Sequence, residues 1–439
     1  MLHSLWENRL FENTIFFSVL VGVVLFLTLI VPALGMSGFA ASSMAAGLTF
    51  IMFFYLIVLK ITATYEEVKK HASVIIKPLI FVIVYIFLHG IVNFFWHDSF
   101  NVNRFFQTFV YLIVFICGAF SFVLVINKIL SEQLDLAIKI VFGMFLLISL
   151  LALFGYSPLQ EGGKAILFYT EPSHFVLDFL PLLLYVVIRS SMKYKIFFLL
   201  IGFELALLMP SITLLVGVVL VALWMLNSRD VLWVLVGFIA LYFLDSLAFH
   251  DLFVQNISSN FAQYAGNTTD YIKGRVLTQE MEVVNLSKLV YLSGFERAYL
   301  NLVDYFGFGV GFQQLGFIGR WGSHMTTLNS IMGRPFGLIE GGTVAAKLIS
   351  EFGMVGMFLL ACYLFFSIKK ALWLRAVSLK ELDYENVQKI FFLSCYITFF
   401  IDLFVRGVGY FTSTGFVFFA SLLWLGLSRT NIKNKNFHK

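Results

Sequence analysis

Three ionisable side chains with helical spacing begin one of the most apolar stretches of the chain. In "FYTEPSHFVLDFLPLLLYVVI", residues 168 to 188, Glu171, His174 and Asp178 precede a run that would suit hydrocarbon. Spacings of three and four residues put them on one helix face, and Pro172 suits the first turn. Such a face could take up a proton or orient a hydroxyl group. The alternative is that Glu171 and His174 cap the helix and form hydrogen bonds at an interface.

The composition is typical of a polytopic membrane protein. Hydrophobic residues make up 60% of the chain, charged residues only 13%, and the mean hydropathy is +0.91. One membrane crossing takes about 20 apolar helical residues. We therefore expect an all-α fold with about twelve transmembrane helices, in a range of about 10 to 14. The expected helices are Thr14 to Leu34, Ala40 to Leu59, Val74 to Phe95, Phe105 to Ile126, Leu136 to Phe154, Ser173 to Ile188, Lys195 to Met209, Ser211 to Leu226, Val231 to Asp245, Thr343 to Ser367, Lys389 to Phe404 and Ser413 to Leu427.

The distribution of Lys and Arg predicts the orientation of these helices. With both termini in the cytoplasm, the inner segments hold twenty Lys and Arg residues, and the short outer loops hold three. Cytoplasmic loops are enriched in Lys and Arg, so this asymmetry favours that orientation and an even number of crossings. The net charge of +5 then reports orientation and does not indicate nucleic-acid binding. The N-terminus lacks a small-residue cleavage site, so we expect an uncleaved first helix.

One long segment interrupts the short loops of an otherwise single helical domain spanning residues 1–439. Residues 246–342 fall on the outer side and are rich in Tyr, Phe and Gly with interspersed Arg, which favours a folded loop. The three cysteines lie in expected helices and match no metal spacing, so we expect no metal site. They are Cys117, Cys362 and Cys395.

Two motifs in and after this loop carry a family resemblance. One is "SGFERAYLNLVDYFGFGVGFQQLGF", residues 293 to 317, and the other is "EGGTVAAKLISEFGMVGMF", residues 340 to 358. An Arg-bearing segment, a G-x-G-x-G turn before Phe and a helix with E-F-G-x-x-G resemble the O-antigen polymerase and ligase superfamily. The E-P-S-H-F stretch at 171 to 175 resembles the polymerase branch. The resemblance covers about residues 168 to 428 in order and spacing.

This resemblance implies an enzyme of the bacterial inner membrane. It would be a metal-independent glycosyltransferase without a cofactor, with a GT-C-like architecture and a site at the periplasmic face. It would join oligosaccharide repeats, with donor and acceptor both carried on undecaprenyl pyrophosphate. Membrane lipids and a chain-length regulator protein are further implied partners, and nucleic acid is not.

The reaction requires cations that neutralise a departing lipid pyrophosphate, and Arg suits this task because its planar fork binds phosphate oxygens bidentately. Arg297 is the first choice, because it occupies the Arg position of the family-like segment. Arg406 lies between two apolar runs, and its alternative is an ion pair with Asp402. Arg275 and Arg334 are further candidates, although a solvated loop charge is the simpler interpretation of Arg275.

The base that deprotonates the attacking hydroxyl remains open among four residues, namely Glu171, His174, His324 and Glu340. The ligase branch has a His just before the re-entering helix, but this chain has Glu340-Gly341-Gly342 there. Glu340 could replace that His, because a partly dry site can raise a carboxylate pKa into a useful range.

Two other functions remain as alternatives. A flippase for the same lipid-linked oligosaccharide would also have about twelve crossings, but transporters of this kind have short loops and two similar halves. An O-antigen ligase would use the same donor, but the absent His and the E-P-S-H-F stretch favour the polymerase. We interpret "GFGVGF" at 307 to 312 as a tight turn beside the active site, since no strand–loop–helix context of a phosphate loop precedes it.

Overall fold

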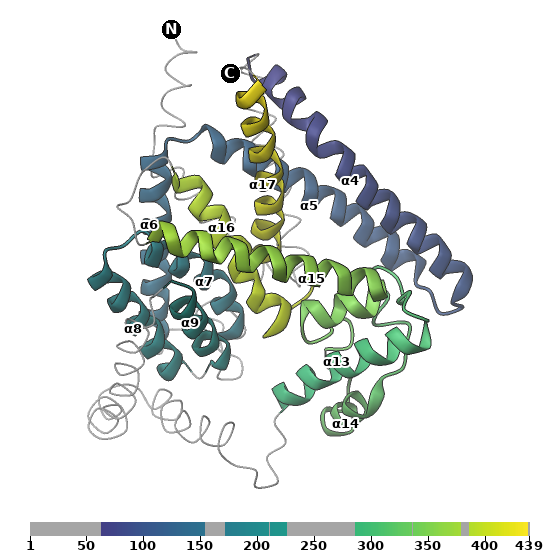
Figure 1. Ribbon diagram of the computed structural model, residues 1–439. Coiled ribbons are helices and arrows are strands. Elements are labelled where there is room, and N and C mark those ends of the chain that lie inside the picture. Colours follow the sequence, from purple (N-terminus) through teal and green to yellow (C-terminus); the bar gives the residue numbers. More distant parts are fainter. Residues whose placement is uncertain are drawn as a thin grey trace, which may run out of the picture. The chain divides into compact units, whose positions relative to one another are not determined.

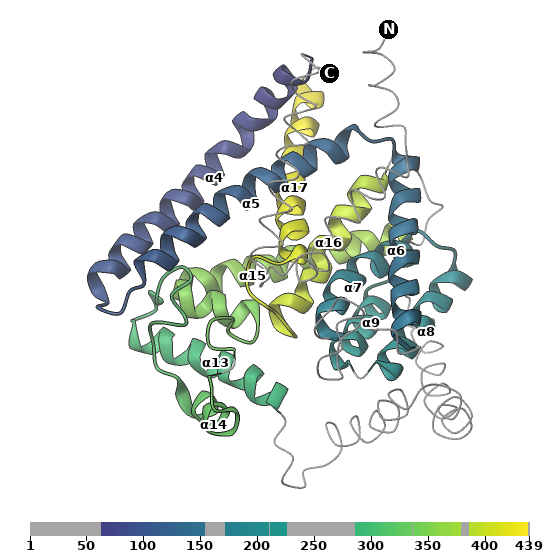
Figure 2. The same ribbon diagram turned by 180° about the vertical axis from the view of Figure 1, so that it is seen from behind.

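A computed structural model describes residues 63–153, 172–209, 211–225, 286–335, 337–378 and 386–437. Within these ranges every regular element is a helix. Figures 1 and 2 show their course from opposite sides. The α-helices are α4 (Ala63–Trp96), α5 (Val102–Lys128), α6 (Ser131–Leu153), α7 (Pro172–Ile188), α8 (Met192–Leu208), α9 (Ile212–Met225), α13 (Leu286–Asp304), α14 (Gly322–Met332), α15 (Val344–Ser378), α16 (Val387–Phe404) and α17 (Ser413–Phe437).

Nine of the twelve expected transmembrane helices correspond to described helices, namely α4 to α9 and α15 to α17. The other three, at 14–34, 40–59 and 231–245, lie outside the described residues. Five described helices are long and apolar enough to cross a membrane, those at 77–96, 102–127, 131–152, 344–378 and 387–404. Three shorter apolar helices accompany them, in α7, α9 and α17. These are the helices of an α-helical membrane protein.

The chain divides into two compact units, each built from separate stretches of sequence. In the described parts, unit 1 contains residues from 129–283 and 367–401, whereas unit 2 contains residues from 38–128, 284–366 and 402–439. Helices α15 and α16 therefore contribute residues to both units.

Helix α7 forms the centre of unit 1, where it packs against α6, α8 and α9 (Figures 1 and 2). From Phe175 to Ile188 its residues are all buried, which explains why, apart from Asp178, this stretch is apolar on every side. The ring of Phe179 stacks on Phe142 of α6 at 5.6 Å. A Cβ at Gly217 of α9 would overlap the side chain of Leu180, so glycine lets α9 approach closely.

A buried ion pair network joins α6 to the C-terminal end of α7. Asp135 accepts hydrogen bonds from Lys139 at 2.6 Å, from the Tyr185 hydroxyl at 2.6 Å and from Arg189 at 3.1 Å. Asp135 and Arg189 are buried, and their mutual contacts offset the cost of removing two charges from water. We assign this network a structural role within unit 1.

Unit 2 combines α4, α5 and α17 with the first part of α15 and with α13 and α14. Phe115 of α5 packs edge to face on Phe416 of α17 at 5.6 Å, and Trp424 donates a hydrogen bond to Asn127 at 3.0 Å. Helices α13 and α14 pack on each other and lie in the second half of the long expected loop. The described part of that loop is thus folded, as its composition predicts.

Candidate functional site

Helix α15 is broken one third of the way along. At Gly353 the backbone has φ 56° and ψ −129°, which interrupts the helical hydrogen bonding. The glycine-rich turn 307–311 supplies the missing partners. Two of its amides donate to the carbonyls of Ser350 and Glu351, at 3.0 and 2.9 Å, and the Gly307 carbonyl accepts from the amide of Met354 at 2.8 Å. The turn therefore docks on the break, in accordance with the rule that buried backbone groups are paired.

The two glycine motifs of the sequence are the two halves of this contact. A Cβ at Gly353 would overlap the Gly307 carbonyl oxygen. At Gly309, where φ is 85°, a Cβ would lie 2.6 Å from the carbonyl oxygen of Glu351. Only glycine combines these left-handed conformations with such a close backbone approach. The expected tight turn at "GFGVGF" is present, and its binding partner is the E-F-G stretch of α15.

A buried ion pair lies one turn before the break. Lys347 Nζ is 3.1 Å from Glu351 Oε1, and the two side chains are 2% and 0% exposed. Lys347 also donates a hydrogen bond to the carbonyl of Ile339 at 2.5 Å, and its ammonium lies 5.4 Å from the centre of the Tyr410 ring. Charges buried in an apolar helix are expensive and therefore point to function.

Arg297 of α13 is a second buried cation in the same unit, with 1% of its surface exposed. Its Nη1 donates to the carbonyl of Leu338 at 2.6 Å, and its Nη2 donates to the carbonyl of Leu315. Burial lowers its pKa to about 10, and the charge of Glu351 opposes that decrease. Arg297 thus stays protonated at neutral pH.

The two cations hold the turn that carries Glu340. Arg297 binds the carbonyl of Leu338, and Lys347 binds the carbonyl of Ile339, so consecutive peptide groups directly before Glu340 are fixed. Glu340 itself is exposed. The turn ends in Gly341 and Gly342, whose φ angles of 75° and 72° favour glycine. The Glu340 carboxylate is therefore exposed, while the backbone directly before it is held by the buried side chains of Arg297 and Lys347.

Several buried polar atoms near this turn have no hydrogen-bond partner among the described residues. They include the hydroxyl of Ser350, Nε of Arg297 and both amide atoms of Asn301. Tyr410 is hydrogen-bonded to Glu351: burial raises the pKa of Tyr410, and the charge of Glu351 and the hydrogen bond to it raise this pKa further. Buried polar groups are normally satisfied, so ordered water or a bound polar group is expected to complete these contacts.

The observed contacts of Arg297 are with the protein's own backbone, and its expected binding of pyrophosphate stays a prediction. The expectation was direct binding of pyrophosphate oxygens, but two guanidinium nitrogens are already bound to carbonyls and the side chain is buried. The physical reason is that the two peptide carbonyls need donors inside unit 2. We therefore treat Arg297 as a positioning residue for the loop 315–338.

We predict that Arg297→Lys will be nearly as damaging as Arg297→Ala. A single ammonium cannot reach both Leu315 and Leu338 with the geometry of the guanidinium fork. Each variant leaves a buried carbonyl without its donor and should lose about 1–3 kcal/mol of stability. Thermal unfolding in detergent measures this loss. If the Lys variant keeps wild-type stability, the charge alone matters and the fork does not.

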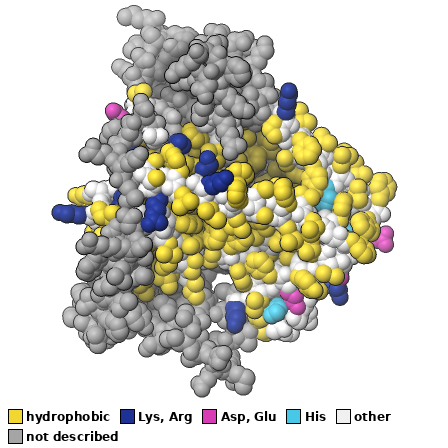
Figure 3. Space-filling view, viewed as in Figure 1, with side chains coloured by type: hydrophobic (Ala, Val, Ile, Leu, Met, Phe, Trp, Pro, Cys, Tyr) yellow, Lys and Arg dark blue, Asp and Glu magenta, His cyan; other side chains and the backbone are white. Residues whose placement is uncertain are grey.

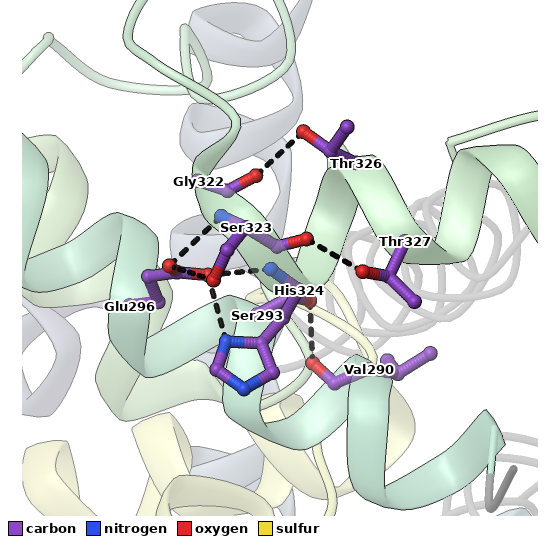
Figure 4. A network of polar contacts seen from close by, with 8 residues as sticks. All are labelled: Val290, Ser293, Glu296, Gly322, Ser323, His324, Thr326 and Thr327. Atoms are coloured by element: carbon purple, nitrogen blue, oxygen red, sulfur yellow. Dashed lines mark hydrogen bonds and ion pairs between the residues drawn. The ribbon is translucent and has the colours of Figure 1, made fainter.

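Glu296 and His324 form a separate polar network between α13 and α14 (Figure 4). The Glu296 carboxylate accepts hydrogen bonds from the amide and hydroxyl of Ser323, at 2.8 and 2.6 Å, and from the amide and Nδ1 of His324, at 2.9 and 2.8 Å. It thereby caps the N-terminus of α14 from a neighbouring helix. Of the sequence candidates, His324 is thus placed in a helix cap.

The capping network predicts an acid-sensitive contribution to stability. Burial opposes ionisation of Glu296, but the hydrogen bonds from Ser323 and His324 outweigh it and lower the pKa from 4.5 to about 2. A lowered pKa means that the contribution is complete above about pH 4.5 and is lost as the pH falls towards 2. The difference in unfolding temperature between wild type and Glu296→Gln should therefore narrow from pH 7 to pH 3.

Ser330→Ala on α14 is the control for this measurement, because it changes no titrating group and its difference from wild type should not depend on pH. We expect Glu296→Ala to lose about 1 kcal/mol at pH 7, as for other helix caps. A Glu296→Gln difference that stays constant between the two pH values would contradict the capping interpretation.

The remaining sequence candidates are dispersed. Glu171 and Arg275 lie outside the described residues. His174 is buried in α7 of unit 1, as is Asp178 one turn later. Arg334 is exposed after α14, and Arg406 is partly buried just beyond the end of α16 at Phe404. Asp402, its expected partner, accepts a hydrogen bond from Thr414 at 2.8 Å.

Comparison with known proteins gives no further assignment. The chain matches no protein-family model, no curated protein and no solved structure.

Metal ligands do not gather in the part of the chain that the structure describes. Within those ranges no group of three or more His, Cys, Asp or Glu residues could hold a metal ion.

Sequence reasoning did not single out Lys347 and Glu351. A signal was present, because a Lys and a Glu at i, i+4 inside an apolar stretch would face each other on a helix. Their contact with the turn before Glu340 could not be foreseen, since it depends on how the preceding loop folds back.

Proposed function

We propose that this protein is an integral membrane glycosyltransferase that polymerises oligosaccharide repeats carried on undecaprenyl pyrophosphate, with a GT-C-like architecture and its site at the periplasmic face. The resemblance of residues 293–317 and 340–358 to the O-antigen polymerase and ligase superfamily, and of residues 171–175 to its polymerase branch, supports the proposal. Twelve crossings with cytoplasmic termini in a bacterial inner membrane belong to the same proposal.

The observation that carries the proposal is the anchoring of Glu340 by two buried cations. The segments with the family-like motifs meet in unit 2, where Arg297 and Lys347 bind the two peptide carbonyls before Glu340. In the ligase branch a His precedes the re-entering helix, and here a carboxylate occupies that stretch.

In the proposed reaction Glu340 is the general base. The acceptor sugar hydroxyl attacks the anomeric carbon of the donor, and its proton passes to Glu340 as the new C–O bond forms. The bond between the anomeric carbon and the pyrophosphate oxygen breaks, and undecaprenyl pyrophosphate leaves. Exposed Arg334 and partly buried Arg406 are the candidates that would stabilise the leaving pyrophosphate. Arg297 and Lys347 act as positioning residues.

A synthetic undecaprenyl-pyrophosphate repeat tests the function directly. Purified protein in phospholipid nanodiscs is incubated with this substrate, and the products are separated on a gel. A ladder of chain lengths identifies a polymerase. Transfer to added lipid A without a ladder identifies a ligase, and movement of intact substrate across a liposome bilayer without chain growth identifies a flippase.

We predict that Glu340→Gln abolishes the ladder. Loss of a general base typically lowers the rate by about 10²- to 10⁴-fold, and the amide preserves the shape of the turn. Glu132→Gln, another exposed carboxylate at the start of α6, is the matched control and should retain full activity. Unfolding temperature and donor binding should be unchanged in both variants.

Glu171→Gln and His174→Asn, measured in the same assay, decide between the remaining candidates. If either variant is inactive while Glu340→Gln retains chain growth, the base lies at the start of α7 and the turn 337–342 is architectural.

A further inference from the structure

Large apolar side chains are exposed at the C-terminal end of α13, where polar side chains are buried on the opposite side. Tyr299, Val303 and Phe306 are 66%, 53% and 87% exposed. The spacing of four residues aligns Tyr299 and Val303 on one side of the helix, and Phe306 follows in the turn after the helix ends at Asp304. We refer to these three residues as the apolar stripe. On the buried side lie Arg297 and Asn301, with exposed fractions of 1% and 0%.

A helix on the surface of a soluble protein turns its large apolar residues inward, so the exposure of these three side chains departs from that pattern. Exposed apolar side chains of this size are stable when the surroundings are lipid. Helix α13 is not among the described helices that are long and apolar enough to cross a membrane. A helix that does not span the membrane but has an exposed apolar face lies along the membrane surface.

The apolar stripe continues into the exposed side of a candidate membrane-spanning helix. The carbonyl of Gly307, directly after Phe306, accepts a hydrogen bond from the amide of Met354 in α15 at 2.8 Å. Met354 and Phe358 are 59% and 67% exposed and lie within the apolar span of α15. Figure 3 shows a mostly hydrophobic surface along α15. The stripe thus extends an apolar surface that is suited to acyl chains.

A polar boundary lies close to the stripe. Asp304, the residue after Val303, pairs with Arg320 through the Arg320 Nε at 2.6 Å, and 65% of the Arg320 side chain is exposed. Alternation of apolar and charged groups over so short a distance is typical of the region between headgroups and hydrocarbon.

We propose that the apolar stripe is inserted into the boundary between lipid headgroups and acyl chains, beside the point where α15 enters the bilayer. The inference concerns lipid as the partner of α13 and does not depend on the reaction proposed above.

Spin labels measure the surroundings of the stripe. The native cysteines Cys117, Cys362 and Cys395 are first replaced by alanine. In this background a label is attached at Phe306→Cys. Separate variants carry the label at Met354→Cys, the lipid reference, and at exposed Thr327→Cys on α14, the water reference. The full chain is reconstituted in liposomes of phosphatidylcholine and phosphatidylglycerol. Collisions with oxygen, which concentrates in lipid, and with a water-soluble nickel chelate are then compared.

We expect the label at position 306 to collide several-fold more with oxygen than with the chelate, as at 354, with the opposite ratio at 327. A ratio at 306 equal to that at 327 would place the stripe in water. Protection from both reagents would place it against protein, and either result overturns the inference.

A second measurement keeps the native cysteines. A photoreactive p-benzoylphenylalanine at position 306 retains an aromatic ring, and irradiation in the same liposomes should give lipid adducts by mass spectrometry. If the cysteine-free chain fails to reconstitute, this result decides, and protein adducts or no lipid adducts overturn the inference.

Discussion

Replacing Glu351 by alanine is expected to destabilise unit 2 by about 3–5 kcal/mol, because Lys347 would remain as a buried charge without its partner. Both side chains are almost fully buried, at 2% and 0% exposure, so water cannot replace the lost carboxylate. Lys347→Ala should have an effect of similar size, since it leaves Glu351 unpaired and removes the donor to Ile339. Thermal unfolding of purified variants in detergent measures both losses.

The double variant Lys347→Met, Glu351→Leu separates folding from function. Apolar side chains of similar volume often replace a buried ion pair without loss of stability, so most of the stability should return. The carbonyl of Ile339 would still lack its donor, and the turn that presents Glu340 would be less firmly held. We therefore expect a folded protein with strongly reduced chain growth and intact donor binding. Wild-type polymerisation by the double variant would show that the pair is only structural.

Gly353→Ala is expected to separate the turn 307–311 from α15. The new Cβ would overlap the carbonyl oxygen of Gly307, and at φ 56° a residue with a side chain carries an additional backbone cost of about 1–2 kcal/mol. The three backbone hydrogen bonds between turn and helix cannot all persist, which leaves buried amides and carbonyls unpaired. Limited proteolysis near residue 309 and a lower unfolding temperature should report the release of the turn.

Gly426→Ala in α17 is the matched control, because a Cβ there would have no atom within 4 Å. Alanine favours a helix over glycine by about 1 kcal/mol, so this variant should be as stable as wild type or slightly more stable. Resistance of Gly353→Ala to proteolysis, with an unchanged unfolding temperature, would mean that the break in α15 does not depend on glycine.

The membrane character and most helix positions could be predicted from the chain alone. Apolar residues must be placed away from water in any fold, so a run of about 20 of them marks a helix whatever its neighbours. This argument located α5, α7 and α16 to within a few residues. The two glycine motifs at 307–311 and 353 were also visible in the sequence, since left-handed backbone strongly favours glycine.

Contacts between distant segments were beyond the reach of the sequence. The helix expected at 343–367 is longer in the structure, because α15 continues to Ser378. It is also broken at Gly353. The sequence could not show this break, because the break depends on hydrogen bonds from a turn more than forty residues earlier. For the same reason the sequence could not show that the Arg297 guanidinium binds two peptide carbonyls.

By itself the sequence determined which residues avoid water, which positions require glycine and which charges lie among apolar residues, because each of these is a property of a residue and its near neighbours. Only the tertiary structure decided that Arg297 and Lys347 bind consecutive carbonyls before Glu340. It also decided that Arg297 and Asn301 of α13 are buried whereas the apolar stripe is exposed. These are outcomes of chain folding, in which buried donors take the nearest free carbonyls whatever their distance in sequence.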